Sequence, residues 1–181
     1  MFVTSPSVAD DILFPSFRGN KATDWGNANE KSAMREYESS IKFKVLPAGL
    51  FVDENLPFLA ASPDGVVSDG EGLVEIKCPY NCRDITPEEG VKNKTVTFME
   101  VKDGRYKLRR RNRYFYQVQG QLEICDKNYC DFIVWSSHGI IIDRIQREKQ
   151  FWATEMVDKL KEFYLNFMLP KICQNTPGYN K

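Results

Sequence analysis

The chain has 181 residues, with 25 lysines and arginines balanced by 25 aspartates and glutamates, so its formal net charge is zero. That balance excludes a globally basic coat, and any contact with nucleic acid must come from a local patch. Hydrophobic residues make up 42% and aromatic residues 13% of the chain, which favours one packed domain over a disordered segment.

The cellular setting is indicated by targeting patterns and cysteines. No stretch approaches the roughly 18 unbroken apolar residues of a membrane span, and the N-terminus lacks a secretory signal pattern. The five cysteines are odd in number and fit no compact zinc motif. We therefore expect an intracellular protein in a reducing compartment, with no membrane partner.

Residues 1–24 carry several turn formers and are expected to be a loosely structured N-terminal segment, with a helical turn over Asp10–Phe14. The first predicted helix covers Trp25–Ser40. Glu30 falls on the same stripe as Ala33, Met34 and Tyr37. A carboxylate on an apolar stripe needs a partner or a cation, unless it lies at the helix edge and reaches water.

Three short strands are predicted next, over 42–46, 50–53 and 57–61, and they read as a meander that ends at Asp64. The following strand, Leu73–Lys77, places Glu75 and Lys77 on one face because side chains alternate. Two carboxylates that converge at a sheet edge suit Mg²⁺ or Mn²⁺. A neighbouring lysine can orient a metal-activated water or balance phosphate charge.

A hairpin is predicted over Thr95–Leu108, after an irregular stretch, with its turn at Lys102–Gly104. Basic residues are concentrated here and just beyond it, interleaved with aromatic residues, a pattern that suits a phosphate backbone. The alternative is a charged hairpin exposed to solvent. The basic residues are Lys102, Arg105, Lys107, Arg109, Arg110, Arg111 and Arg113.

A second helix is predicted over Asn112–Cys125, with Gln117 and Gln121 on a different face from its apolar stripe. A glutamine there can bridge a metal-bound water, a ligand or a phosphate, or it can cap backbone groups. Two strands follow, over 130–136 and 140–145. The only histidine, His138, lies in the turn between them and is expected to be a loop residue.

The last predicted helix covers Arg147–Leu169 and is amphipathic; Pro170 is expected to stop it, leaving residues 171–181 as a tail. The order of elements predicts an α/β (α+β) fold, with a central mixed β-sheet flanked by helices.

Four motifs occur in register: Trp25–Glu30 opening a helix, Ser62–Gly65, Val74–Pro79 and Tyr116–Gln121. Together they resemble the phage lambda exonuclease family, also described as YqaJ-type viral recombinases, within the PD-(D/E)xK nuclease superfamily. The resemblance covers about residues 25–170. It implies a restriction-endonuclease-like core with a basic hairpin inserted at 95–113.

The resemblance also implies an Mg²⁺-dependent (or Mn²⁺-dependent) exonuclease that degrades double-stranded DNA from 5′ ends. The remaining 3′ single strand would pass to an annealing protein. Residue by residue, it implies the following roles: metal binding by Asp64, Glu75 and the carbonyl of Ile76, and catalysis by Lys77 with Glu30 and Gln117.

The expected DNA contacts are the seven basic residues of 102–113 together with Tyr114 and Gln121. One family feature, an N-terminal arginine module that holds the DNA 5′-phosphate, has no counterpart before Trp25, where Arg18 is a poor substitute. Three alternatives stay open: an endonuclease with the same site, a catalytically silent DNA-binding module, and a protein-interaction domain. The sequence does not indicate the oligomeric state.

Overall fold

The computed structural model describes residues 6–16 and 18–175. The chain divides into two compact units. One unit covers Gly19–Glu148, and the other combines the N-terminal segment with the helices that follow Glu148. All the residues proposed above for the active site and for DNA contact lie in the first unit.

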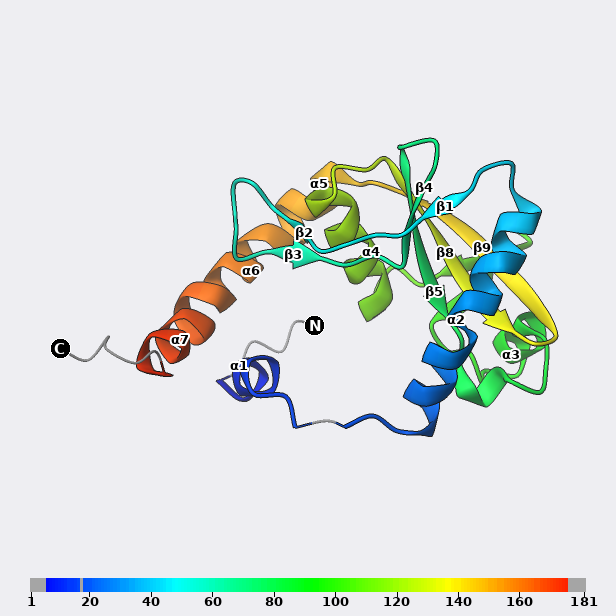
Figure 1. The fold of residues 1–181 in the computed structure, drawn as a ribbon, viewed down its shortest axis with the longest axis horizontal. Helices are drawn as coiled ribbons and strands as arrows, with labels where there is room; N and C mark the ends of the chain where they lie inside the picture. Colours follow the sequence, from blue (N-terminus) through cyan, green and yellow to red (C-terminus); the bar gives the residue numbers. More distant parts are fainter. Residues whose placement is uncertain (1–5, 17, 176–181) are drawn as a thin grey trace. The chain divides into compact units, whose positions relative to one another are not determined.

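The centre of the first unit is a five-stranded mixed sheet in the order β1-β4-β5-β8-β9 (Figure 1). Strands β5 and β8 run parallel, and the other neighbouring strands are antiparallel. The expected mixed sheet is therefore confirmed. The strands are β1 (Val45–Leu46), β4 (Gly65–Val67), β5 (Gly72–Lys77), β8 (Tyr129–Ser136) and β9 (Gly139–Gln146).

Two helices cover opposite faces of this sheet. Helix α2 (Lys21–Ser40) begins earlier than predicted, because the side chain of Asn20 accepts hydrogen bonds from the first free backbone N–H groups. Its Tyr37 packs on the face that carries Val74 and Ile76. Because side chains alternate, Glu75 points to the other face, which is covered by α4 (Arg113–Ile124).

The strands before Asp64 differ from the predicted meander. β1 pairs with β4, whereas β2 (Phe51–Val52) and β3 (Ala60–Ala61) form a separate two-stranded ribbon. Asp53 closes that ribbon, since its N–H donates to Leu59 and its side chain caps the turn. The meander prediction is wrong because turn signals locate the ends of strands and do not identify the partner of each strand.

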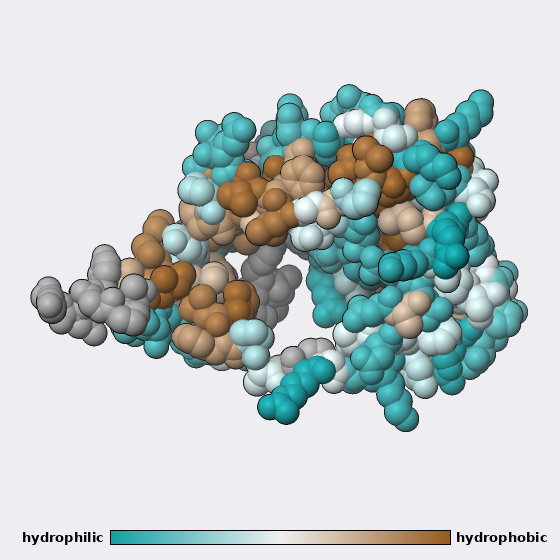
Figure 2. Space-filling model, viewed as in Figure 1, coloured by the Kyte–Doolittle hydropathy of each residue, from teal (hydrophilic) through white to brown (hydrophobic). Residues whose placement is uncertain are grey.

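Figure 2 shows hydrophobic side chains gathered over the β2–β3 ribbon, where Leu50 and Val52 are exposed.

The expected basic hairpin is present as β6 (Met99–Lys102) and β7 (Arg105–Leu108). Its two turn residues, Asp103 and Gly104, both have positive φ, as a tight two-residue hairpin requires. The stretch before it contains a 3-10 turn, η1 (Tyr80–Cys82), and a helix, α3 (Pro87–Lys92). The sequence signal for α3 was the capping box of Thr86 and Glu89 with Pro87 between them.

The second unit is helical. It contains α1 (Pro6–Leu13) and a continuous helical run made of α5 (Lys149–Phe151), η2 (Trp152–Met156), α6 (Val157–Phe163), η3 (Tyr164–Met168) and α7 (Leu169–Asn175). The expected stop at Pro170 is wrong, because the helix continues to Asn175. The π-helical turn η3 comes just before Pro170 and widens the hydrogen-bond register there, which accommodates a residue without an N–H. The rest of the predicted tail lies outside the described residues.

No described helix is both long and apolar enough to cross a membrane.

Candidate active site

Asp64 and Glu75 are brought together by the pairing of β4 with β5. The N–H of Asp64 donates to the carbonyl of Val74 at 3.0 Å, and its Oδ2 accepts from the N–H of Ile76 at 2.6 Å. The Asp64 carboxylate is therefore held against the backbone of β5, beside the residue that carries the second carboxylate.

The Glu75 carboxylate is buried, with the residue only 2% exposed, and donors surround it. Its Oε1 accepts from Lys77 Nζ and, at 2.7 Å, from Gln117 Nε2. Its Oε2 accepts from Gln121 Nε2 at 2.7 Å. Two glutamines one turn apart on α4 thus bind the two oxygens of one carboxylate.

A cleft of about 560 Å³ opens beside these groups. Its lining includes Glu30 from α2, Asp64, and Ile76 and Lys77 from β5, with Arg113 and Tyr114 from the start of α4. The structure therefore brings six of the predicted site residues into one cleft, while Glu75 and the two glutamines are not among its lining residues and connect to it through the hydrogen bond of Lys77 to Glu75. The first turns of α2 also line the cleft through Asn20, Thr23 and Asn27, which are not among the predicted site residues. The position of Asn20 as a helix N-cap was the available signal.

Negative charge accumulates in the cleft. Burial, the charge of Glu75 and, less strongly, that of Glu30 together raise the pKa of Asp64 from 3.8 to about 6, against the opposing effects of the Ile76 N–H and Lys77. Burial, followed by the charges of Glu30 and Asp64, also raises the pKa of the Cys78 thiol to about 12. This thiol is therefore neutral at physiological pH, and the cleft favours a cation.

The donor atoms fit a hard divalent cation better than a soft one. Among the described residues, no three histidine, cysteine, aspartate or glutamate side chains converge as a ready metal cage. Asp64 and Glu75 nevertheless offer carboxylate oxygens, and the Ile76 backbone adds a carbonyl. Burial and the charges of Glu75 and Glu30 raise the pKa of Asp64, so a bound cation would offset the cost of ionising this carboxylate. This set suits Mg²⁺ or Mn²⁺, which retain several water ligands.

Tyr114 links the lysine to the edge of the cleft. Lys77 Nζ lies 5.0 Å from the centre of its ring, and the Arg113 guanidinium lies 4.9 Å from the same centre. Arg113 also donates to the tyrosine hydroxyl at 3.1 Å. Phe98 and Phe132 pack against the ring, with centroid distances of 5.1 and 5.9 Å. The ring thus has two cationic groups close to it and is packed by two aromatic rings.

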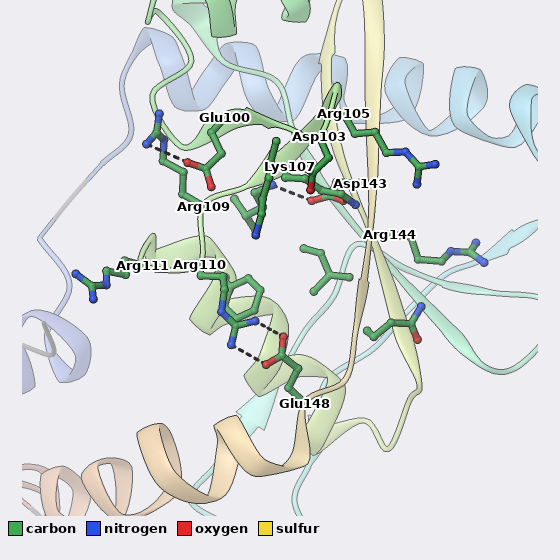
Figure 3. A pocket seen from close by; sticks show the side chains of 15 residues that line it. Glu100, Asp103, Arg105, Lys107, Arg109, Arg110, Arg111, Asp143, Arg144 and Glu148 are labelled. Carbon is green, nitrogen blue, oxygen red and sulfur yellow. Dashed lines mark hydrogen bonds and ion pairs between the residues drawn. The ribbon is translucent and has the colours of Figure 1, made fainter.

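The other predicted DNA-contacting residues lie mainly along a separate groove of about 840 Å³, between the β6–β7 hairpin and β9 (Figure 3). Several are already ion-paired: Lys107 with Asp143 at 2.6 Å, Arg109 with Glu100 at 3.3 Å, and Arg110 with Glu148 at 2.8 Å. Lys102, Arg105 and Arg111 have no ion pair within the part of the chain that the structure describes. Figure 3 shows Arg105 and Arg111 directed away from the three pairs.

Gln121 differs from its expected role. The residue is 4% exposed and donates to Glu75, so its amide is turned into the protein and away from any DNA. A helical period identifies residues that share a face but does not identify what lies opposite that face.

The comparisons with known proteins agree with this geometry. A family model described as "YqaJ-like viral recombinase domain" matches residues 6–128. The alkaline nuclease of Autographa californica nuclear polyhedrosis virus is 26% identical over 133 residues, which are 65% of this chain and 32% of that protein. The chain thus spans about a third of the length of this curated relative.

Solved structures share the fold. An alkaline exonuclease (LHK-Exo) from Laribacter hongkongensis superposes with a TM-score of 0.64 and 24% identity, covering 91% of this chain and 80% of that one. A phage-related exonuclease from Haemophilus somnus 129PT gives a TM-score of 0.59 and 17% identity, covering 93% and 81%. The restriction-endonuclease-like fold expected from the sequence is confirmed. Because the family model covers more than half of its length, the chain belongs to the YqaJ-like viral recombinase domain family.

Proposed function

We propose that the chain is a metal-dependent deoxyribonuclease that hydrolyses double-stranded DNA as an exonuclease, from 5′ ends. The observation that carries the proposal is a cleft lined by Asp64, Lys77 and Glu30, with the buried Glu75 carboxylate hydrogen-bonded to Lys77 and close enough to Asp64 to raise its pKa. The names of the matched relatives, an alkaline nuclease and an alkaline exonuclease, describe the same class of reaction.

The residues of the site have separate roles in this proposal. Asp64, Glu75 and the Ile76 carbonyl would hold Mg²⁺ or Mn²⁺, which when bound would neutralise phosphate charge and lower the pKa of a water. Gln117 holds one oxygen of Glu75, and Glu30 adds a carboxylate to the lining of the cleft. Lys77, anchored by Glu75 and facing the Tyr114 ring, orients the attacking water and balances charge on the phosphate.

DNA contact is proposed at two places. Arg113 and Tyr114 line the cleft and would meet the backbone and an unstacked base at the cut end. The groove beside the β6–β7 hairpin would hold phosphates further along the duplex, chiefly through Lys102, Arg105 and Arg111. The 3′ strand left behind would be a substrate for a single-strand annealing protein.

The test is digestion of end-labelled linear duplex with Mg²⁺, with and without a 5′-phosphate, beside a covalently closed circle of the same sequence. We expect the linear duplex to be shortened from its 5′ ends and the circle to remain intact. Cleavage of the circle would replace the exonuclease with an endonuclease that uses the same residues. DNA binding without metal-dependent hydrolysis would leave only a binding module.

A further inference from the structure

Gln121 is placed where it can control the orientation of Glu75. Its Nε2 lies 2.7 Å from Glu75 Oε2, deep between α4 and β5. The other oxygen, Oε1, has two donors, Lys77 and Gln117. Among the described residues, Gln121 is the one side chain that donates to Oε2, so its hydrogen bond has no substitute there.

The other end of the same amide is left without a partner. Gln121 Oε1 is one of two buried side-chain polar atoms in the described part of the chain that have no hydrogen-bond partner. A buried carbonyl without a donor is destabilising, and an apolar side chain of equal length would avoid that cost. Packing alone therefore does not account for a glutamine at this position.

The direction of the amide follows from its neighbour. Turning it over would bring its carbonyl oxygen against a carboxylate oxygen, which is repulsive when Glu75 is ionised. The terminal torsion of a glutamate is soft, so donors on one oxygen alone leave the carboxylate plane free to rotate. A second donor on the other oxygen fixes that plane.

We propose that Gln121 is a positioning residue: through Glu75 Oε2 it holds the carboxylate in the orientation in which it binds the divalent cation. The inference rests on the proposed metal-dependent function. It replaces the expected DNA contact of this residue with a role inside the protein. Hydrogen-bonding partners of metal ligands typically change metal affinity by about 10–100-fold when they are removed.

The experiment compares two substitutions on α4 in the full chain. Gln121→Met keeps the length of the side chain and removes the donor. Gln119→Met is the matched control: Gln119 is 1% exposed, donates to the Gln146 carbonyl at 2.9 Å and accepts from the Glu148 N–H at 2.8 Å, without contacting Glu75. Mn²⁺ binding is measured by titration calorimetry without DNA, beside thermal unfolding with EDTA.

We expect Gln121→Met to bind Mn²⁺ about tenfold more weakly. It should also unfold at a lower temperature than the wild type, because a buried carboxylate oxygen loses its donor. Gln119→Met should unfold at a lower temperature and bind Mn²⁺ like the wild type. In cleavage assays, Gln121→Met should need more Mg²⁺ for half-maximal rate, at an unchanged KM for DNA. If Gln121→Met does not fold, Gln121→Asn serves instead, because it keeps the amide but is one methylene too short to reach Oε2.

Equal Mn²⁺ affinity in the wild type and a folded Gln121 variant would overturn the inference while leaving the nuclease proposal standing. Equal weakening by Gln119→Met would also overturn it, since the effect would then come from helix packing. If the wild type binds no Mn²⁺ and does not cleave DNA, the metal site itself is wrong, and the inference fails with it.

Discussion

At the scale of single residues, Lys77 depends on its neighbours for its position. A lysine on a strand end normally moves freely among many rotamers, but Nζ is here tied to Glu75 and lies over the Tyr114 ring. The ammonium group is thereby delivered to the wall of the cleft next to Asp64. Such a fixed cation lowers the reorganisation needed when negative charge grows on a phosphate.

Replacing this lysine tests its role directly. We expect Lys77→Ala to reduce cleavage by at least about 10²–10³-fold, because the charge facing the phosphate is lost, while DNA binding survives. Single-turnover cleavage and a gel-shift assay on the same duplex measure the two effects. Lys92→Ala, at an exposed position on α3, is the control and should behave like the wild type. Mg²⁺-dependent cleavage at the wild-type rate by Lys77→Ala would remove the lysine from the mechanism.

Asp64 is held at a cost in stability when no metal is bound. Its pKa is raised to about 6, so the folded state binds the proton more tightly than the unfolded state does. The corresponding stabilisation is fully present below about pH 4 and is lost as the pH rises through about 6. Metal-free wild-type protein at pH 8 therefore carries an ionised Asp64 that opposes folding.

We expect Asp64→Asn to be more stable than the wild type at pH 8 with EDTA, by on the order of 1–2 kcal/mol, and the difference to disappear near pH 4. Added Mn²⁺ should raise the unfolding temperature of the wild type and not of the variant. Denaturant unfolding at the two pH values measures this. Asp84→Asn, whose side chain is 77% exposed, provides a control with little change expected. Lower stability of Asp64→Asn at pH 8 would show that the carboxylate stabilises the fold.

The sequence predicted which of these residues come together better than it predicted their contacts. Alternation along a strand was enough to put Glu75 and Lys77 on one face, and the 3, 4, 7 spacing was enough to align Glu30 with the buried stripe of α2. What lies opposite a given face depends on the packing of distant elements. That is why the hydrogen bond of Gln121 to Glu75 became visible only in the structure.

At the scale of elements, the β6–β7 hairpin is anchored by a buried acid on β9. Asp143 accepts from the Leu108 N–H at 2.8 Å and from Lys107 at 2.6 Å. The basic residues of 102–113 thus have different roles. Some form ion pairs with acidic side chains of the protein, and others face the groove. The charge pattern predicted a basic hairpin correctly. It gave no means of telling these two groups apart, since two of the three acids, Asp143 and Glu148, come from β9 and the segment after it.

The difference between these two groups of basic residues predicts which of them bind DNA. We expect replacement of Lys102, Arg105 and Arg111 by glutamine to weaken binding and to lower the salt dependence of log K by up to about 3, at roughly 0.9 for each phosphate that is no longer neutralised. Fluorescence anisotropy across a series of salt concentrations measures the slope. Three exposed lysines outside the groove, Lys31, Lys42 and Lys92, form the matched control triple. If both triple variants lowered the slope equally, DNA binding would depend on the total charge of the protein and not on the groove.

At the scale of the whole molecule, the proposed catalytic residues are confined to one of the two units. Every residue of the cleft comes from within Gly19–Glu148. The other unit has its own internal packing, including that of α1 against η3, and the ion pair of Lys171 with Asp10. The chain as a whole carries no net charge, so the proposed attraction for DNA has to arise from a local patch such as the groove of the first unit.

Deleting residues 1–18 should therefore leave the metal site intact. The deletion removes α1 and Arg18 and breaks the ion pair with Lys171, but it removes no residue of the cleft. We expect Mn²⁺ affinity, measured by titration calorimetry, to stay within about twofold of the full chain, because affinity follows the ligands and their hydrogen-bonding partners. Lys171→Ala, which breaks the same ion pair without shortening the chain, separates the effect of the pair from that of the segment. A folded deletion variant that no longer bound Mn²⁺ would mean that the N-terminal segment contributes to the site and that the two units act together.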